Sequence, residues 1–260
     1  MPLDRRKFIK LSGLTVLGLA GSSPARIFAQ ETPAETESEP GIHPLTAKRW
    51  AMVVNLRECM AHPDCSDCVS ACNHVHNVPQ FDNKKDEVKW IWKDTFPHIF
   101  EDAEHEYLKE DIKHAPVLAL CNHCDNPPCV RVCPTQATWK REKDGIVMMD
   151  WHRCIGCRYC VVACPYGARS FNWRDPRPFI KDIQTDFPTR MRGVVEKCIF
   201  CEERLSKGLM PACVDACKYG AMAFGDLEEP DSPVRELLRN NFTIRRKPGL
   251  GTQPEVYYIV

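Results

Sequence analysis

Short apolar runs, each leading into a group of cysteines, are the main pattern of the chain. The run "WAMVVNL" (50–56) predicts a buried strand just before the first cysteine group, and the domain is expected to begin there. The runs "GIVMMD" (145–150) and "GVVEK" (193–197) precede the third and fourth groups in the same way. A strand followed by a cysteine loop is therefore a repeated unit, and this repetition indicates duplicated modules.

Other elements follow from the polar pattern between and after these units. The segment "ATWKREKDGIVMMD" predicts a hairpin that turns at Asp144 and Gly145. The segment "EDAEHEYLKED" (101–111) predicts a charged helix within an insertion between the first two cysteine groups. Asp231 or Ser232 followed by Pro233 predicts a capped helix through 240, and the apolar tail "GLGTQPEVYYIV" is expected to be extended and to pack on the body.

The N-terminus has the pattern of an export signal. Arg5 and Arg6 form a twin-arginine pair ahead of an apolar stretch over 11–20, which is too short to span a bilayer as a helix. We expect cleavage after Ala29, with Ala25 as the alternative site, and export to the periplasm. An uncleaved amphipathic helix is the competing interpretation.

The expected organisation is a signal peptide over 1–29, a flexible leader over 30–48 and one domain over 49–260. The leader contains "ETPAETESEPG", which has almost nothing to bury. The whole chain carries 35 basic and 35 acidic side chains, so its charge does not favour a nucleic-acid partner. No other apolar stretch approaches the length of a membrane span, so any membrane association is expected to go through partner subunits.

The chain has 16 cysteines, which fall into four groups of four. The groups are Cys59, Cys65, Cys68 and Cys72; Cys121, Cys124, Cys129 and Cys133; Cys154, Cys157, Cys160 and Cys164; and Cys198, Cys201, Cys213 and Cys217. The third group, "CIGCRYCVVACP", matches the C-x2-C-x2-C-x3-C-P run that binds [4Fe-4S] clusters through thiolates. Structural zinc sites use two separated ligand pairs, and cysteines at every third position do not suit disulfide geometry. Gly156 within this loop is expected to let the backbone approach the cluster.

The other groups depart from this spacing to different degrees. The second adds two residues before its third cysteine, and the fourth has eleven residues between its second and third, enough for a helix through Leu205. The first has five residues between Cys59 and Cys65, so its spacing departs most from the cluster-binding run. Cys59 there could be a spare thiol, with a [3Fe-4S] cluster, no cluster, or His62 or Asp64 filling the gap. We favour four cysteine ligands because the 16 cysteines divide into four complete sets.

Histidines and tryptophans near the cysteines are given structural roles. We expect His74, His76, His98 and His123 to be surface or hydrogen-bonding residues. We expect Trp90, Trp92 and Trp173 to lie in the core or at an interface. Twin-arginine export carries folded proteins, so a thiolate cofactor can be inserted in the reducing cytoplasm beforehand.

The segments "CNHCDNPPCVRVCPTQAT", "CIGCRYCVVACPYGAR" and "KCIFCEERLSKGLMPACVDAC" closely resemble the four-cluster ferredoxin-like electron-transfer subunits of bacterial membrane oxidoreductases. That family includes subunits of polysulfide, nitrite and dimethyl sulfoxide reductases, and the resemblance spans 50–260. It implies an α+β fold of two double-cluster ferredoxin-like units related by a pseudo-twofold axis. The inner unit covers 119–180, and the outer unit combines 50–80 with 193–226.

The resemblance also implies that ligands cross between cysteine groups. The implied sets are Cys59/Cys65/Cys68/Cys217, Cys72/Cys198/Cys201/Cys213, Cys121/Cys124/Cys129/Cys164 and Cys133/Cys154/Cys157/Cys160. Each set would hold one [4Fe-4S] cluster. Lys218 stands where the family often has a proline after the last cysteine.

The expected function is non-catalytic electron transfer between a quinone-reactive integral membrane subunit and a periplasmic multihaem cytochrome c, in sulfur or sulfite respiration. The chain has no C-x-x-C-H haem motif and no nucleotide-binding glycine loop. Three alternatives remain open. They are the iron-sulfur subunit of another reductase (polysulfide, nitrite or tetrathionate), an enzyme with a catalytic first cluster, and a binding protein stabilised by zinc or disulfides.

Overall fold

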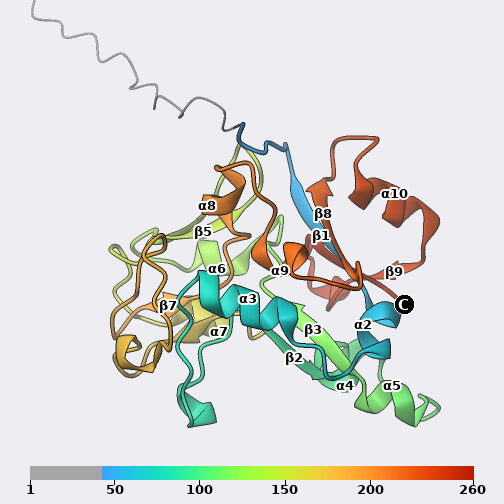
Figure 1. The fold of residues 1–260 in the computed structure, drawn as a ribbon, viewed down its shortest axis with the longest axis horizontal. Helices are drawn as coiled ribbons and strands as arrows, with labels where there is room; N and C mark the ends of the chain where they lie inside the picture. Colours follow the sequence, from blue (N-terminus) through green and yellow to red (C-terminus); the bar gives the residue numbers. More distant parts are fainter. Residues whose placement is uncertain (1–42) are drawn as a thin grey trace, which may run out of the picture. The chain divides into compact units, whose positions relative to one another are not determined.

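A computed structural model describes residues 43–260 (Figure 1), so the predicted signal peptide and most of the leader lie outside the described residues. Its strands are β1 (Trp50–Asn55), β2 (Ile91–Thr95), β3 (Pro116–Leu120), β4 (Thr138–Lys140), β5 (Val147–Met149), β6 (Ser170–Phe171), β7 (Val195–Glu196), β8 (Met222–Asp226), β9 (Thr243–Ile244) and β10 (Val256–Ile259). Its α-helices are α2 (Leu56–Ala61), α3 (Asp67–Val75), α4 (Phe96–Ile99), α5 (Glu110–His114), α6 (Pro128–Arg131), α7 (Tyr159–Ala163), α8 (Glu202–Leu205), α9 (Ala212–Asp215) and α10 (Pro233–Asn240). This mixture of short elements agrees with the predicted α+β class.

The largest sheet of the described residues brings the first and last strands together. Its order is β8-β1-β10-β9, with β1 antiparallel to β8 and parallel to β10. Met52 lies opposite Phe224 on one side and opposite Val256 on the other, and all three side chains are buried. The strand predicted at 50–56 and the packing of the apolar tail are both confirmed.

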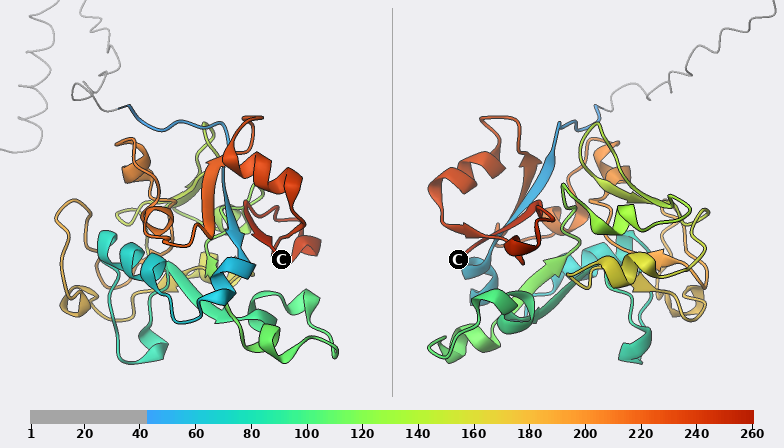
Figure 2. Two further views of the ribbon diagram at one scale, coloured as in Figure 1. Left: turned by 45° about the vertical axis from the view of Figure 1, so that its right-hand side comes forward. Right: turned by 180° about the vertical axis from the view of Figure 1, so that it is seen from behind.

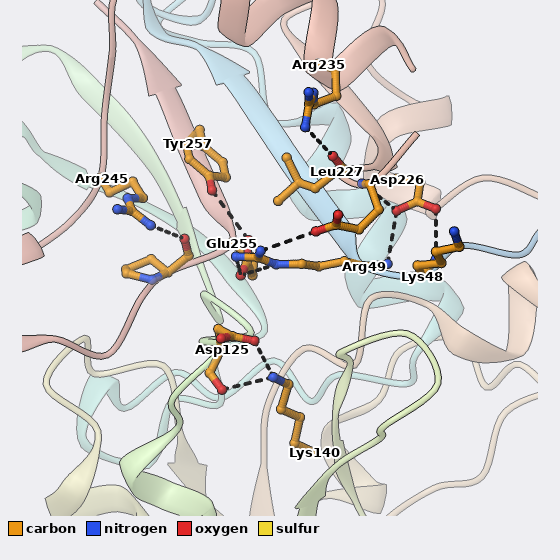
Figure 3. Close-up of polar contacts among 12 residues, drawn as sticks. Lys48, Arg49, Asp125, Lys140, Asp226, Leu227, Arg235, Arg245, Glu255 and Tyr257 are labelled. Atoms are coloured by element: carbon orange, nitrogen blue, oxygen red, sulfur yellow. Dashed lines mark hydrogen bonds and ion pairs between the residues drawn. The ribbon is translucent and has the colours of Figure 1, made fainter. Parts of the chain in front are cut away.

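Polar contacts tie the start of β1 to both neighbouring strands (Figure 3). The backbone N–H groups of Lys48 and Arg49 donate to the Asp226 carboxylate at 2.8 and 3.0 Å, at the end of β8. The Arg49 side chain extends the other way, and its Nε donates to Glu255 Oε1 at 2.9 Å, next to β10. These contacts attach the residues just before β1 to both neighbouring strands.

Helix α10 covers one face of this sheet and contacts β8 and β1 (Figure 2). The Ser232 hydroxyl caps the helix by accepting a hydrogen bond from the Arg235 N–H at 3.3 Å, and Pro233 occupies the first turn. Val234 is fully buried against the sheet. The helix predicted over 233–240 is therefore confirmed.

Three two-stranded ribbons build most of the rest: β2 with β3, β4 with β5, and β6 with β7. The β4–β5 ribbon turns at Gly145, whose φ of 78° is left-handed, as the hairpin prediction requires. The charged helix predicted over 101–111 is wrong, because only a 3-10 turn (Glu101–Ala103) and the later α5 form. Tyr107 between them is 83 % exposed and only Leu108 of this segment is partly buried against the core, so the segment buries little of the apolar surface that gives most short helices their stability.

The core of the described residues contains both aromatic side chains and cysteines. Trp90 is fully buried and donates from Nε1 to Glu196 Oε2 at 2.9 Å, which confirms its predicted place in the core. Trp92 is half-buried, whereas Trp173 is exposed. Among residues 43–260, no helix combines the length and the apolar character needed to cross a bilayer.

Candidate metal centres

The third cysteine of every group occupies the same local position. Cys68, Cys129, Cys160 and Cys213 are each the second residue of a short helix: α3, α6, α7 and α9, respectively. Helix α3 packs against α9, and α6 packs against α7 (Figure 1). Residues from different cysteine groups are therefore brought together in two helix pairs.

The first thiol set, Cys59, Cys65, Cys68 and Cys217, combines three cysteines of the first group with the last cysteine of the chain. Burial, and then the nearby thiols of Cys59, Cys217 and Cys65, raise the pKa of Cys68 to about 11. Cys217 reaches this set from the turn that follows α9, and its Sγ accepts a hydrogen bond from the Ala221 N–H at 3.2 Å. The structure therefore brings Cys217 to the first group, away from its own.

The second thiol set is Cys72, Cys198, Cys201 and Cys213, and all four side chains are buried. Burial, and then the thiols of Cys201, Cys198 and Cys213, raise the pKa of Cys72 well above its usual value. The Ala212 N–H donates to Cys201 Sγ at 3.4 Å. Cys72 of the first cysteine group thus lies with the fourth group, and Cys217 of the fourth group lies with the first.

The third thiol set is Cys121, Cys124, Cys129 and Cys164. Burial, and then the thiols of Cys121, Cys129 and Cys164, raise the pKa of Cys124 to about 12, although a hydrogen bond with Thr252 lowers it. Cys164 directly follows α7, which contacts α6. It lies near the second group and not near the third, to which it belongs in sequence.

The fourth thiol set is Cys133, Cys154, Cys157 and Cys160, which line one cavity together. Burial raises the pKa of Cys133, but backbone hydrogen bonds from 135, 137 and 138 and the Thr135 hydroxyl outweigh burial, so the pKa is below its usual value. This thiol is therefore prepared for the thiolate form, in which cysteine binds metals.

The four sets form a row. Three pairs of cysteines connect neighbouring sets: Cys68 with Cys213, Cys121 with Cys198, and Cys129 with Cys160. In each pair, the negative charge of one cysteine in its thiolate form raises the pKa of the other cysteine. The two side chains therefore lie close together. The order is therefore first, second, third and fourth set.

Exposure differs between the ends and the middle of the row. The half-buried cysteines of the two end sets are Cys59, Cys65, Cys217, Cys133, Cys154 and Cys157. The second set has none, and the third has only Cys164. Both ends of the row thus approach the surface, while its middle lies in the core.

The chemistry of these side chains fits [4Fe-4S] clusters. All 16 cysteines are free thiols, and no carboxylate or imidazole is required to complete a set of four. Burial disfavours an uncompensated thiolate, so the buried sets need cationic centres, which ligated iron provides. Four converging thiolates are the ligands that such clusters use.

Gly156 and Lys218 make contacts that the sequence analysis did not predict. Gly156 has a φ of 67°, and a Cβ there would lie 2.2 Å from the Gly193 carbonyl oxygen, so the close approach that needs glycine is to another part of the chain. Lys218, directly after Cys217, lies with Nζ 2.9 Å from Asp67 Oδ2 at the start of α3. This ion pair links the turn after Cys217 to the first group.

The histidines near the sets make hydrogen bonds, as predicted. His76 Nε2 lies 2.9 Å from Glu203 Oε1, and these two residues with Cys201 form a group whose ligand atoms lie within 4.8 Å of one another. A separate metal there would take Cys201 from the second set. His123 Nδ1 accepts from the Val147 N–H at 3.1 Å, and burial lowers the pKa of His123 well below its usual value. His74 and His98 are more exposed and lie near Asp182 and Asp94.

Two buried cations near the thiols were missed by the sequence analysis. Arg169 donates from Nη2 to Cys129 Sγ at 3.0 Å. Lys197 is fully buried, and its Nζ donates to the backbone oxygens of Val147 and Cys198. The available signal was their position, because Arg169 closes "CPYGAR" and Lys197 directly precedes Cys198.

Two family models that match parts of the chain identify its class of protein. Residues 113–178 and residues 153–221 each match a family model described as a 4Fe-4S dicluster domain. Together with the thiol chemistry, these matches define a ferredoxin-type protein that binds [4Fe-4S] clusters.

Similar proteins that match almost the whole chain identify its family. The chain is 38 % identical to the Hdr-like menaquinol oxidoreductase iron-sulfur subunit 1 of Archaeoglobus fulgidus, over 98 % of this chain and 97 % of the relative. It is 34 % identical to a tetrathionate reductase subunit of Salmonella typhimurium (100 % and 89 %) and 32 % identical to protein NrfC of Escherichia coli (100 % and 96 %). The chain belongs to this family of iron-sulfur subunits of oxidoreductase complexes, and its role is electron transfer, not catalysis.

Proposed function

We propose that the chain relays electrons through four [4Fe-4S] clusters, one in each thiol set. The proposed ligands are the sixteen cysteines in the crossed pairing described above: Cys59/Cys65/Cys68/Cys217, Cys72/Cys198/Cys201/Cys213, Cys121/Cys124/Cys129/Cys164 and Cys133/Cys154/Cys157/Cys160. The proximity of these thiols supports the pairing. It also supports two double-cluster units, an outer one from the first two sets and an inner one from the last two.

The exposure pattern of the row is the observation that carries this proposal. A bound [4Fe-4S] cluster supplies reversible one-electron chemistry, with a potential that depends on its surroundings. The chain's own residues keep the second and third sets away from water and leave the first and fourth sets near the surface. Such an arrangement suits entry of electrons at one end and exit at the other.

The proposed partners are a quinone-reactive integral membrane subunit and a periplasmic multihaem cytochrome c. Relatives named as subunits of a menaquinol oxidoreductase and of a menaquinone reductase support the first partner. The surface at the fourth set suits contact with a protein, since Ile155, Tyr159, Val162 and Trp173 are exposed there. The Arg158 guanidinium lies 4.8 Å from the Trp173 ring centroid. The twin-arginine pair supports a periplasmic location.

The particular role that we propose is that of DsrO, the periplasmic iron-sulfur subunit of the sulfite-reduction-associated membrane complex. The supporting features are the leader with Arg5 and Arg6, "NHVHNVP" after the first cysteine group and "NWRDPRPFI" after the third. The other candidate within the family is the iron-sulfur subunit of another reductase, of the polysulfide, nitrite or tetrathionate type. Relatives with tetrathionate reductase and NrfC names favour that candidate.

Cluster content and a redox titration test the proposal. Protein purified without air is expected to contain about sixteen irons and about sixteen sulfides per chain, because each of four cubanes holds four of each. Electron paramagnetic resonance during the titration should resolve four reducible centres. About half that iron, in protein whose folding is confirmed by circular dichroism, would contradict the four-cluster assignment.

A further inference from the structure

Arg169 occupies an unusual position between two thiol sets. Its side chain is 4 % exposed, and Nη2 donates to Cys129 Sγ at 3.0 Å and to Thr138 Oγ1 at 2.9 Å. Nη1 lies 4.0 Å from Met149 Sδ. The guanidinium is therefore held in place by a proposed cluster ligand and by strand β4.

No carboxylate of the described residues compensates this buried charge, and the ion pairs found among them do not include Arg169. Burial lowers the pKa of its guanidinium, but the thiols of Cys129, Cys160, Cys121 and Cys164 outweigh burial and hold the pKa above its usual value. A buried cation normally requires a charged partner, and here the groups that can supply negative charge are sulfurs.

These sulfurs belong to two different sets. Cys129 lies in the third set, and Thr138 and Met149, which Arg169 also contacts, line the cavity shared by the four cysteines of the fourth set. The planar guanidinium offers five N–H donors in a fixed geometry, so one side chain can serve sulfurs on both sides. An arginine in this position is a single fixed charge shared by two neighbouring sites.

We propose that Arg169 raises the reduction potentials of the third and fourth sites together. The inference rests on the proposed function, because it requires a cluster in each of these sets. Reduction adds one electron to a site, supplied by the preceding redox partner, and no bond forms or breaks. The added negative charge is stabilised by the nearby cation, and burial strengthens this attraction relative to water. Arginine stays protonated at every physiological pH, so the effect is permanent.

The test compares three variants in the full protein by redox titration with electron paramagnetic resonance. Arg169→Met removes the charge, Arg169→Lys keeps it, and Arg246→Met is the matched control. Arg246 is also a buried arginine, but it donates to the backbone oxygens of Ile99 and Tyr166 and to no cysteine. Iron content is measured for every variant.

We expect Arg169→Met to make reduction of two of the four centres at least about tenfold less favourable, which is about 59 mV for a one-electron couple. The other two centres, all four centres of Arg169→Lys and all four of Arg246→Met should change by less than this. Unchanged potentials in Arg169→Met, or an equal shift in all four centres, would overturn the proposal.

Two further outcomes separate a folding defect and a failed function from a failed inference. If Arg169→Met cannot hold its clusters, Arg169→Gln provides a neutral variant that keeps a polar amide at this position, and the same two-centre shift is expected. Should wild-type protein lack four centres, the proposed function fails. With four centres present and no shift in either neutral variant, only the role of Arg169 fails.

Discussion

Arg190 and Glu196 form an ion pair in the core, with Nη2 2.6 Å from Oε2 and both side chains at most 1 % exposed. The Glu196 carboxylate also accepts hydrogen bonds from Trp90 Nε1 and from Asn172 Nδ2. Arg190 in turn donates to the backbone oxygens of His76 and Asn77, which end the first cysteine segment. One buried carboxylate thus joins β7, just before the fourth cysteine group, to the end of α3.

Glu196→Gln is expected to destabilise the protein by about 3–5 kcal/mol, because it leaves the Arg190 charge buried without its partner. Denaturant unfolding under anaerobic conditions measures this change. Asp175→Asn is the control, since it breaks an exposed ion pair with Arg177 and should leave the unfolding midpoint unchanged. Equal midpoints for Glu196→Gln and wild type would show that the core pair contributes nothing to stability.

Cys164→Ser is expected to perturb the third site, held by Cys121, Cys124 and Cys129, and to spare the fourth. Serine is a poor replacement because its alkoxide is harder and much more basic than a thiolate. The third site should fall to a three-iron form or shift its potential, as observed by electron paramagnetic resonance.

The reciprocal variant, Cys133→Ser, completes this test. It should perturb the fourth site, held by Cys154, Cys157 and Cys160, although Cys133 belongs to the second cysteine group. If each serine variant damaged only the site of its own sequence neighbours, the crossed pairing would be wrong.

Gly156→Ala is expected to lower stability and to reduce occupancy of the fourth site. The new Cβ would lie 2.2 Å from the Gly193 carbonyl oxygen, and both atoms are fixed by backbone. Gly167→Ala is the matched control, because φ there is 63° but a Cβ meets nothing within 4 Å. We expect about 1–2 kcal/mol for the control from the left-handed conformation, and about 1–3 kcal/mol more for Gly156→Ala from the clash. Similar unfolding midpoints and iron contents for the two variants would argue against the close contact.

Arg5→Lys combined with Arg6→Lys is expected to leave an uncleaved precursor in the cytoplasm with its clusters already inserted. Cell fractionation and the iron content of the retained protein measure the outcome. Charge is kept by the change to lysine, so a loss of export points to recognition of the paired guanidinium groups. Normal accumulation of the variant in the periplasm would refute this export route.

Sequence reasoning succeeded where local pattern decides the structure. Apolar runs located β1, β5 and β7, Gly145 located a turn, and Ser232 with Pro233 located α10. It failed at 101–111, because charged residues with good helix propensity do not sustain a helix when Leu108 alone is partly buried against the core.

The buried cations show a different limit. Arg169 and Lys197 look like ordinary surface residues in the sequence, since nothing in the adjacent residues indicates that a charged side chain is buried there. Their burial depends on sulfurs that come from other parts of the chain, and no local pattern encodes that. The partner of the apolar tail was equally hidden, because β10 pairs with β1 across almost the whole domain.

The position of β1 between β8 and β10 has a consequence for the order of biosynthesis. β1 leaves the ribosome before the other described strands, yet both strands that pair with it follow much later in the chain. Until then, its buried apolar residues and its backbone donors have no native partners, and contacts so distant in sequence form slowly. The sheet can close only after β10 has been synthesised, so a product truncated before β10 would expose an unpaired apolar strand that chaperones and proteases could recognise.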